Sequence, residues 1–197
     1  MSINLTYLRF SPEEFVRATS SQSAWQAARG SPLPGLDLAQ LQEMSKNPTP
    51  EAMQKFLAAM QAKAADPARV DLDKWWHVFL FLLTGVHEIQ EGHKVGHPLH
   101  NVIFGGTPTA VSTGYGPVRA LSGDQLREVS EALSGVTAES FMSRWNIEEM
   151  RAKDIYACPY EEEEEEEREM ALELLNQLKT FLAEAHAQGQ VVVIYGH

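Results

Sequence analysis

The stretch DLDKWWHVFLFLLTG, residues 71–85, constrains the fold more than any other part of the chain. At 100° per residue its apolar side chains cover nearly the whole circumference of a helix, as expected at the centre of a core. Asp71 is a suitable N-cap, and Gly85 is suited to end the helix. The pure apolar run VFLFLL is far shorter than the ~20 residues of a membrane span. We therefore predict a buried central helix and no membrane-spanning segment.

The two ends of the sequence have the patterns of strands. Residues 3–10, INLTYLRF, alternate with period two, and residues 191–196, VVVIYG, are apolar on both faces. Residues 117–122, PVRALS, predict a third short strand. Capping residues before periodic runs predict helices after Ser11 (with Glu14), Thr49, Ser122 (with Gln125), Thr137 and Asn146. We expect an α+β fold, a mostly helical single domain over residues 1–197 with a small mixed sheet that includes the N- and C-terminal strands.

The net charge of −11 is concentrated in one segment. Residues 161–169, EEEEEEERE, contribute −7 of it. The run is either the solvated start of the last helix, or a surface, Glu161–Glu167, on which a basic partner protein lands. The sequence contains no basic stripe, so nucleic acid is not an expected partner.

Asp73 and His77 are the first candidate site. They are four residues apart on the predicted central helix and would share one face. Beside Trp76 they would form an acid–base pair or a ligand-binding pair. The alternative is a satisfied polar pair at the rim of the core helix. We favour that alternative because the sequence identifies no Ser, Cys or metal partner.

The segment GYGPVR, residues 114–119, is the second candidate. Its Gly-x-Gly precedes the predicted strand, so it does not match a dinucleotide-binding loop. Tyr115 and Arg119 would line a small anion site, assisted by the helix N-terminus at Ser122.

Residues 86–116 contain the densest set of metal-ligand residue types. A zinc or iron site needs three or four such groups in one pocket. Their spacing matches no zinc pattern, and Gly96 and Pro98 oppose a helix there, so we favour a polar loop and predict neither a metal nor another cofactor. The residues concerned are His87, Glu88, Glu91, His93, His97 and His100.

Cys158 is the only cysteine in the sequence, which excludes an internal disulfide and fits a reducing compartment. We interpret it as an ordinary residue, because a nucleophilic cysteine needs a partner such as His. The N-terminus, MSINLTYLRF, lacks the features of a signal peptide, so a cytoplasmic location is expected.

Four blocks together resemble one family. DLDKWWHVFLFLLTG, HPLHNVIFGG, GYGPVRALSGDQL and VVVIYG are similar to the YfbM-like bacterial proteins, domain of unknown function 1877. The resemblance spans most of the chain and implies a compact α+β domain in a bacterial cytosol, without an assigned activity. Relatives commonly carry His where this chain has Leu80, and Ile-Tyr-Pro where it has IYACPY. The glutamate run also exceeds the family's usual acidity at that position.

Two classes of function remain. The favoured interpretation is a non-catalytic interaction protein whose acidic patch binds a basic protein, for example a toxin domain that it neutralises. The alternative is a small-ligand-binding protein or enzyme with a pocket at Asp73, Trp76 and His77. A deep pocket that holds His77 and Arg119 would favour the alternative.

Overall fold

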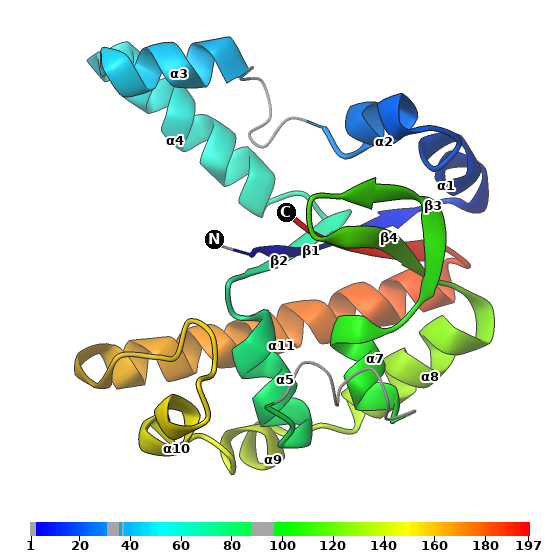
Figure 1. Cartoon of the computed structure of the whole chain (residues 1–197), viewed down its shortest axis with the longest axis vertical. Helices are drawn as coiled ribbons and strands as arrows, with labels where there is room; N and C mark the ends of the chain where they lie inside the picture. Colours follow the sequence, from blue (N-terminus) through cyan, green and yellow to red (C-terminus); the bar gives the residue numbers. More distant parts are fainter. Residues whose placement is uncertain (1–2, 31–35, 37, 88–96) are drawn as a thin grey trace.

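One antiparallel sheet organises the chain in the computed structural model, which describes residues 3–30, 36, 38–87 and 97–197 (Figure 1). The strands are β1 (Leu5–Phe10), β2 (Arg69–Asp73), β3 (Thr107–Thr113), β4 (Gly116–Leu121) and β5 (Val191–Gly196). Their order is β2-β1-β5-β4-β3, and every pairing is antiparallel. The predicted α+β class is confirmed, including both terminal strands, but the described sheet is antiparallel instead of mixed.

Helices cover both faces of the sheet. Figure 1 shows α5, α7, α8, α9 and α11 on one side, α1 and α2 on the other, and α3 and α4 extending away from the body. Their bounds are α1 Pro12–Ala18, α2 Gln22–Ala28, α3 Leu38–Lys46, α4 Pro50–Ala64, α5 Trp76–Thr84, α7 Pro98–Phe104, α8 Gly123–Ser134, α9 Ala138–Met142, α10 Ile147–Ala152, η1 Glu161–Glu163 (a 3₁₀ turn) and α11 Glu164–Ala187. None of the described helices combines the length and the apolarity that crossing a membrane requires.

Helix α5 lies at the centre of the larger core, as the apolar pattern predicted. All its side chains from Trp76 to Leu83 are buried. The rings of Phe79 and Phe141 lie 5.2 Å apart between centroids. The helix ends at Gly85, which is left-handed at φ 75° and donates its N–H to the carbonyl of Phe81.

The predicted start of this helix is wrong. Residues 69–73 form β2, so Asp71 lies in a strand and does not cap α5. Val70 and Leu72 are buried, as a period-two strand paired with β1 requires. Leu72 fits the helical pattern and the strand pattern equally well, and pairing with β1 decides between them.

Capping residues located the other helices well. Ser11 and Glu14 form the predicted capping box, and Thr49, Thr137 and Asn146 each accept a hydrogen bond from the first turn of their helix. Ser122 precedes α8 as predicted but its side chain makes no capping hydrogen bond. Besides β2, the helix α2 was not predicted, and β3 lies where the sequence favours a polar loop.

The other face of the sheet carries a smaller core. Trp25 of α2 packs edge-on against Tyr195 of β5, with ring centroids 5.0 Å apart, and Val118 and Val193 belong to the same buried cluster. The projecting α3–α4 pair has its own small cluster around Ala59. The two faces therefore have different chemical environments, and candidate sites lie on both.

Candidate functional site

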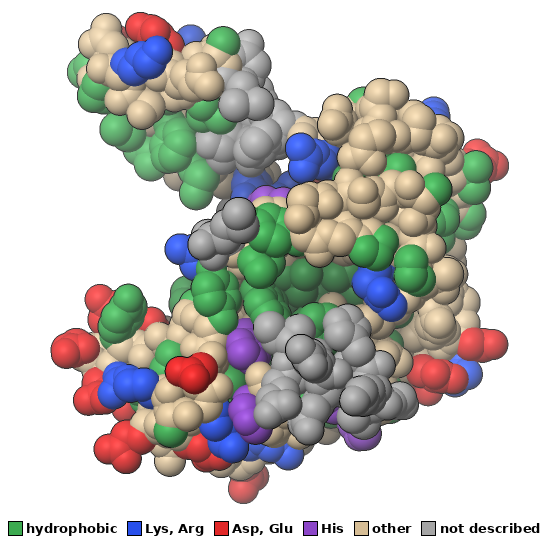
Figure 2. All heavy atoms as spheres, viewed as in Figure 1, with side chains coloured by type: hydrophobic (Ala, Val, Ile, Leu, Met, Phe, Trp, Pro, Cys, Tyr) green, Lys and Arg blue, Asp and Glu red, His purple; other side chains and the backbone are tan. Residues whose placement is uncertain are grey.

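The acidic patch, defined as Glu161–Glu167, occupies η1 and the first turn of α11. The positive end of the helix dipole favours carboxylates there, by roughly 0.3–1 kcal/mol each at low salt. Figure 2 shows red side chains gathered at the end of the molecule where α10 and the start of α11 lie. The prediction that this run opens the last helix is confirmed.

Three glutamates of the patch have partners in the protein. Glu161 pairs with Arg151 at 2.7 Å, Glu164 with Arg168 at 3.5 Å, and Glu167 accepts the backbone N–H of Tyr160 at 2.8 Å. The other four, Glu162, Glu163, Glu165 and Glu166, are exposed and form no ion pair with the described residues. These four carboxylates are available to a partner.

A cleft of about 740 Å³ adjoins the patch. One wall comes from the turn between β2 and α5 and the other from α11 and the segment after α10. Its apolar lining residues are Leu72, Trp75, Tyr156, Met170 and Leu174, together with the ring of Tyr160. Its charged lining residues are the carboxylates Asp71, Asp73 and Glu167 and one cation, Lys74, so a net acidic charge and aromatic groups meet in one concave surface.

Two side chains at the rim of the cleft are unusually exposed for their type. Tyr160 is 67% exposed and Met170 is 40% exposed. Tyrosine and methionine are enriched at contact surfaces between proteins.

Backbone strain also gathers at the cleft. Asp73 and Ala157 both line it, and both adopt the left-handed conformation, with φ of 45° and 53°. A non-glycine residue pays roughly 1–2 kcal/mol for this conformation. Residues held in such conformations are enriched at functional sites.

Cys158 lines the same cleft but is not activated. It is half-buried, its Sγ lies 3.7 Å from the carbonyl oxygen of Ile147, and burial raises the pKa of its thiol. A raised pKa keeps the thiol protonated, which is the opposite of what a nucleophile requires.

The predicted Asp73–His77 pair does not form on one helix face. Asp73 ends β2, whereas His77 lies in the first turn of α5 and is buried. His77 accepts the backbone N–H of Tyr156 on Nδ1 at 2.9 Å, so its Nε2 carries the proton and donates to the carbonyl of His87 at 2.7 Å. Burial lowers its pKa. His77 therefore joins three separate parts of the backbone as a neutral ring.

Trp76, Tyr115 and Arg119 do lie together. They line a pocket of about 350 Å³ whose lining does not include His77 or Asp73. Arg119 donates from Nε and Nη2 to the carbonyls of Gly105 and Gly106, at 2.9 and 2.8 Å, and so fixes the turn between α7 and β3. Much of its hydrogen-bonding capacity is thus used within the protein.

Only part of the histidine-rich segment lies within the described residues. Glu88, Glu91 and His93 lie outside the described residues. His97 caps α7 by accepting the N–H of Leu99, and the buried ring of His100 has no hydrogen-bond partner among the residues described. Within the described ranges, no three His, Cys, Asp or Glu side chains converge as a metal site would require.

The protein is thus of the α+β class, with helices on both faces of one sheet and a cleft lined by acidic and aromatic side chains. The chain belongs to the family described as Domain of unknown function (DUF1877), whose model matches residues 1–195. The resemblance to the YfbM-like proteins is thereby confirmed. The cleft residues Tyr160, Cys158 and Met170 were not predicted as a group, since no motif links them.

A solved structure has the same fold. The protein of unknown function YfbM from Escherichia coli superposes with a TM-score of 0.61 over 97% of this chain and 98% of that chain. The two sequences are 14% identical, so the likeness concerns the fold alone. No curated protein is similar enough to this chain to count as a match.

Proposed function

We propose that the protein is a non-catalytic interaction module that binds a basic segment of a partner protein. The observation that carries this proposal is the position of the acidic patch beside the aromatic-walled cleft. Unpaired glutamates attract a basic partner and speed its association, while a concave apolar surface holds an anchoring side chain. Either feature alone would be ordinary.

The cleft suits an arginine or lysine side chain of the partner. Trp75 and Tyr160 provide aromatic faces, which attract cations, and Asp73 and Glu167 provide carboxylates. The anchor of the partner would therefore be a basic residue with a long aliphatic stem, which packs along Met170.

The state of the candidate catalytic groups supports binding over catalysis. Both ring nitrogens of His77 are engaged by the backbone, and the thiol of Cys158 has a raised pKa. A general base needs a free nitrogen near a substrate, and a nucleophile needs activation.

Charge guides our choice of partner class. A protein with a basic surface, such as a toxin domain that must be neutralised in a bacterial cytosol, would complement the acidic patch. Such a complex would weaken at higher salt, because the glutamates are exposed and screened.

A pull-down from lysate of the native cell, at low and moderate salt, tests the proposal. The variant changes Glu162, Glu163, Glu165 and Glu166 to Gln, which spares the three paired glutamates. A matched control changes Glu13, Glu43, Glu51 and Glu128 to Gln; these are also exposed but lie on other helices. We expect a stoichiometric basic partner with the wild type and the control and its loss in the patch variant. Equal capture by all three proteins would refute the role of the patch.

A second candidate function rests on the pocket shared by Trp76, Tyr115 and Arg119. Its volume is at the lower end of the range for small-ligand sites. Screening of small carboxylates by thermal shift, with Arg119→Lys as the comparison, tests it; a ligand that stabilises both proteins equally would contradict a contact with the Arg119 guanidinium.

A further inference from the structure

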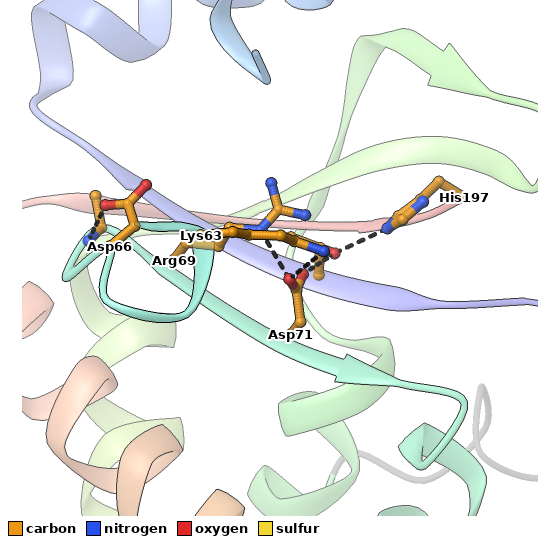
Figure 3. A network of polar contacts seen from close by, with 7 residues as sticks. Lys63, Asp66, Arg69, Asp71 and His197 are labelled. Carbon is orange, nitrogen blue, oxygen red and sulfur yellow. Dashed lines mark hydrogen bonds and ion pairs between the residues drawn. The ribbon is translucent and has the colours of Figure 1, made fainter. Parts of the chain in front are cut away.

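A polar cluster lies on the sheet face opposite the larger core, beneath α4 (Figure 3). Asp71 accepts from Arg69 Nε at 2.9 Å and from Lys63 Nζ at 3.0 Å, and it also accepts from the hydroxyl of Thr6. Nε2 of His197 lies 3.0 Å from the same hydroxyl oxygen. Burial acts to raise the pKa of Asp71, but hydrogen bonds from Arg69 and Thr6 and the charge of Arg69 lower it overall. Asp71 is therefore an anion that fixes two cations in place.

The positions of these cations leave hydrogen-bond donors unused. Arg69 contacts Asp71 through Nε only, and Figure 3 shows the two Nη atoms of its guanidinium directed away from the carboxylate. The backbone N–H of Arg29 ends α2 by donating to the carbonyl of Trp25, but its guanidinium forms no hydrogen bond or ion pair with the residues that the structure describes. Both side chains are at least partly buried. Neither guanidinium is among the buried polar groups that lack a partner, so water reaches the unused donors and an anion can take its place there.

These donors meet in a pocket of about 250 Å³ between β1, β2, the end of α2 and the end of α4. Of the residues described, Arg9, Arg29, Lys63 and Arg69 supply its cations and Asp66 supplies its single carboxylate. Asp66 is already engaged, since its Oδ1 accepts the N–H of Ala68 at 2.9 Å.

The local charge stays positive when neighbouring acids are included. Arg9 pairs with Glu184 at 2.7 Å, and Asp71 neutralises one of Lys63 and Arg69. Asp66 offsets the other of these two cations, so the four cations and three carboxylates leave a net charge of +1, which corresponds to Arg29. Figure 2 agrees with this balance, because blue side chains gather in the hollow between the α3–α4 pair and the body.

The pocket also has an apolar side, formed by Leu8, Phe10, Ala28 and Ala68. A bare phosphate would leave this surface uncovered, whereas an organic group would pack against it. We propose that the pocket binds a small phosphate monoester, with its phosphate on Arg29 and Arg69 and its organic part against Phe10. The ammonium of Lys63 attracts the phosphate as well. Its side chain need not be ordered on binding, because the ion pair with Asp71 already fixes it.

This site lies on the other face of the sheet from most of the acidic cleft and does not depend on the partner proposed above. The test uses phenyl phosphate, inorganic phosphate and phenol as probes, measured by calorimetry at constant ionic strength. We expect saturable 1:1 binding of phenyl phosphate, weaker binding of inorganic phosphate, and no binding of phenol.

Arg29→Gln is the decisive variant, because within the described ranges the Arg29 side chain has no hydrogen bond or ion pair to lose and the fold should survive. We expect it to weaken phenyl phosphate binding by about tenfold or more, the value of a charge-assisted hydrogen bond. Arg127→Gln on α8, a half-buried arginine paired with Asp124 and Glu131, is the matched control and should bind as the wild type does. No saturable binding, or equal affinity of Arg29→Gln and wild type, would overturn the proposal. Equal affinities for phenyl phosphate and inorganic phosphate would overturn the proposal that the organic part of the ligand packs against Phe10.

Discussion

Nδ1 of His77 accepts the backbone N–H of Tyr156, a residue 79 positions later in the chain, at 2.9 Å. The bond ties the central helix α5 to the segment that leads into the acidic patch. Because Nε2 of the same ring donates to the carbonyl of His87, the imidazole must stay neutral to serve both partners.

His77→Gln should therefore destabilise the protein by about 2–3 kcal/mol, since two backbone groups lose well-placed partners. Chemical denaturation at pH 7.5 measures the change. A loss below about 0.5 kcal/mol would mean that the imidazole bridges contribute little.

The same residue predicts a pH dependence. Burial lowers the pKa of His77 below 6.5, so at mildly acidic pH the unfolded chain binds a proton that the folded chain rejects. The contribution to stability is present above pH 6.5 and is lost as the pH falls from there through the lowered pKa of the folded state. The free energy of unfolding of the wild type should fall more steeply between pH 7.5 and 5 than that of His77→Gln. Parallel curves would contradict this assignment.

Ala157→Gly should stabilise the protein by about 0.5–1 kcal/mol. Ala157 has the left-handed φ of 53°, and glycine adopts this conformation without strain. The free energy gained in this way exceeds the free energy lost because glycine raises the conformational entropy of the unfolded chain. Ala183→Gly, at an exposed position within α11, is the control and should cost about 1 kcal/mol. Thermal and urea unfolding of both variants would show whether the signs differ as expected.

Phe79→Ala should cost about 3–5 kcal/mol, because it opens a cavity beside Phe141 at the centre of the core. Leu57→Ala on α4 should change stability by less than about 0.5 kcal/mol, because this side chain is 54% exposed. Urea titrations measure both changes in the free energy of unfolding, provided that the m-values of the variants equal that of the wild type. A large cost at Leu57 would indicate that the exposed face of α4 is covered in solution.

Tyr160→Ala should weaken binding of the captured partner by about tenfold without changing the melting temperature, if Tyr160 is an anchor at the cleft. Val16→Ala offers the comparison, since Val16 is 68% exposed on α1, away from the patch. Surface plasmon resonance with the purified partner would separate the two. Equal affinities would remove Tyr160 from the contact surface.

Local patterns predicted most elements because each had its own start signal. Ser11, Thr49, Thr137 and Asn146 marked helices, and period-two or continuous apolar runs marked β1 and β5. The boundary at Asp71 could not be predicted in this way. Whether RVDLD is strand or helix depends on β1, more than sixty residues earlier, which satisfies its backbone hydrogen bonds.

The candidate sites were harder to predict for the same reason. The Asp73–His77 pair assumed a helix with Asp71 as N-cap, whereas the N-cap of α5 is Trp75, four residues later. The cleft assembles residues 71–75, 156–160 and 167–174, and the phosphate pocket assembles residues from β1, α2, α4 and β2. No spacing along the sequence predicts these contacts between distant segments. The glutamate run could be predicted as a patch because it is continuous in the sequence.

The pairing of β1 with β5 has a consequence for how the protein is made. Leu5 pairs with Gly196 and Phe10 with Val191. The strand β1, which leaves the ribosome early, therefore cannot form this pairing until β5 has been synthesised. Closing a loop of that length slows folding, because the entropy is lost before the contacts form. Until β5 emerges, the sheet lacks the strand that joins β1 to β4, and both cores stay open along that gap. We expect ribosome-stalled chains that stop before Val191 to be degraded by added protease, and release of the full chain to bring resistance in a single step.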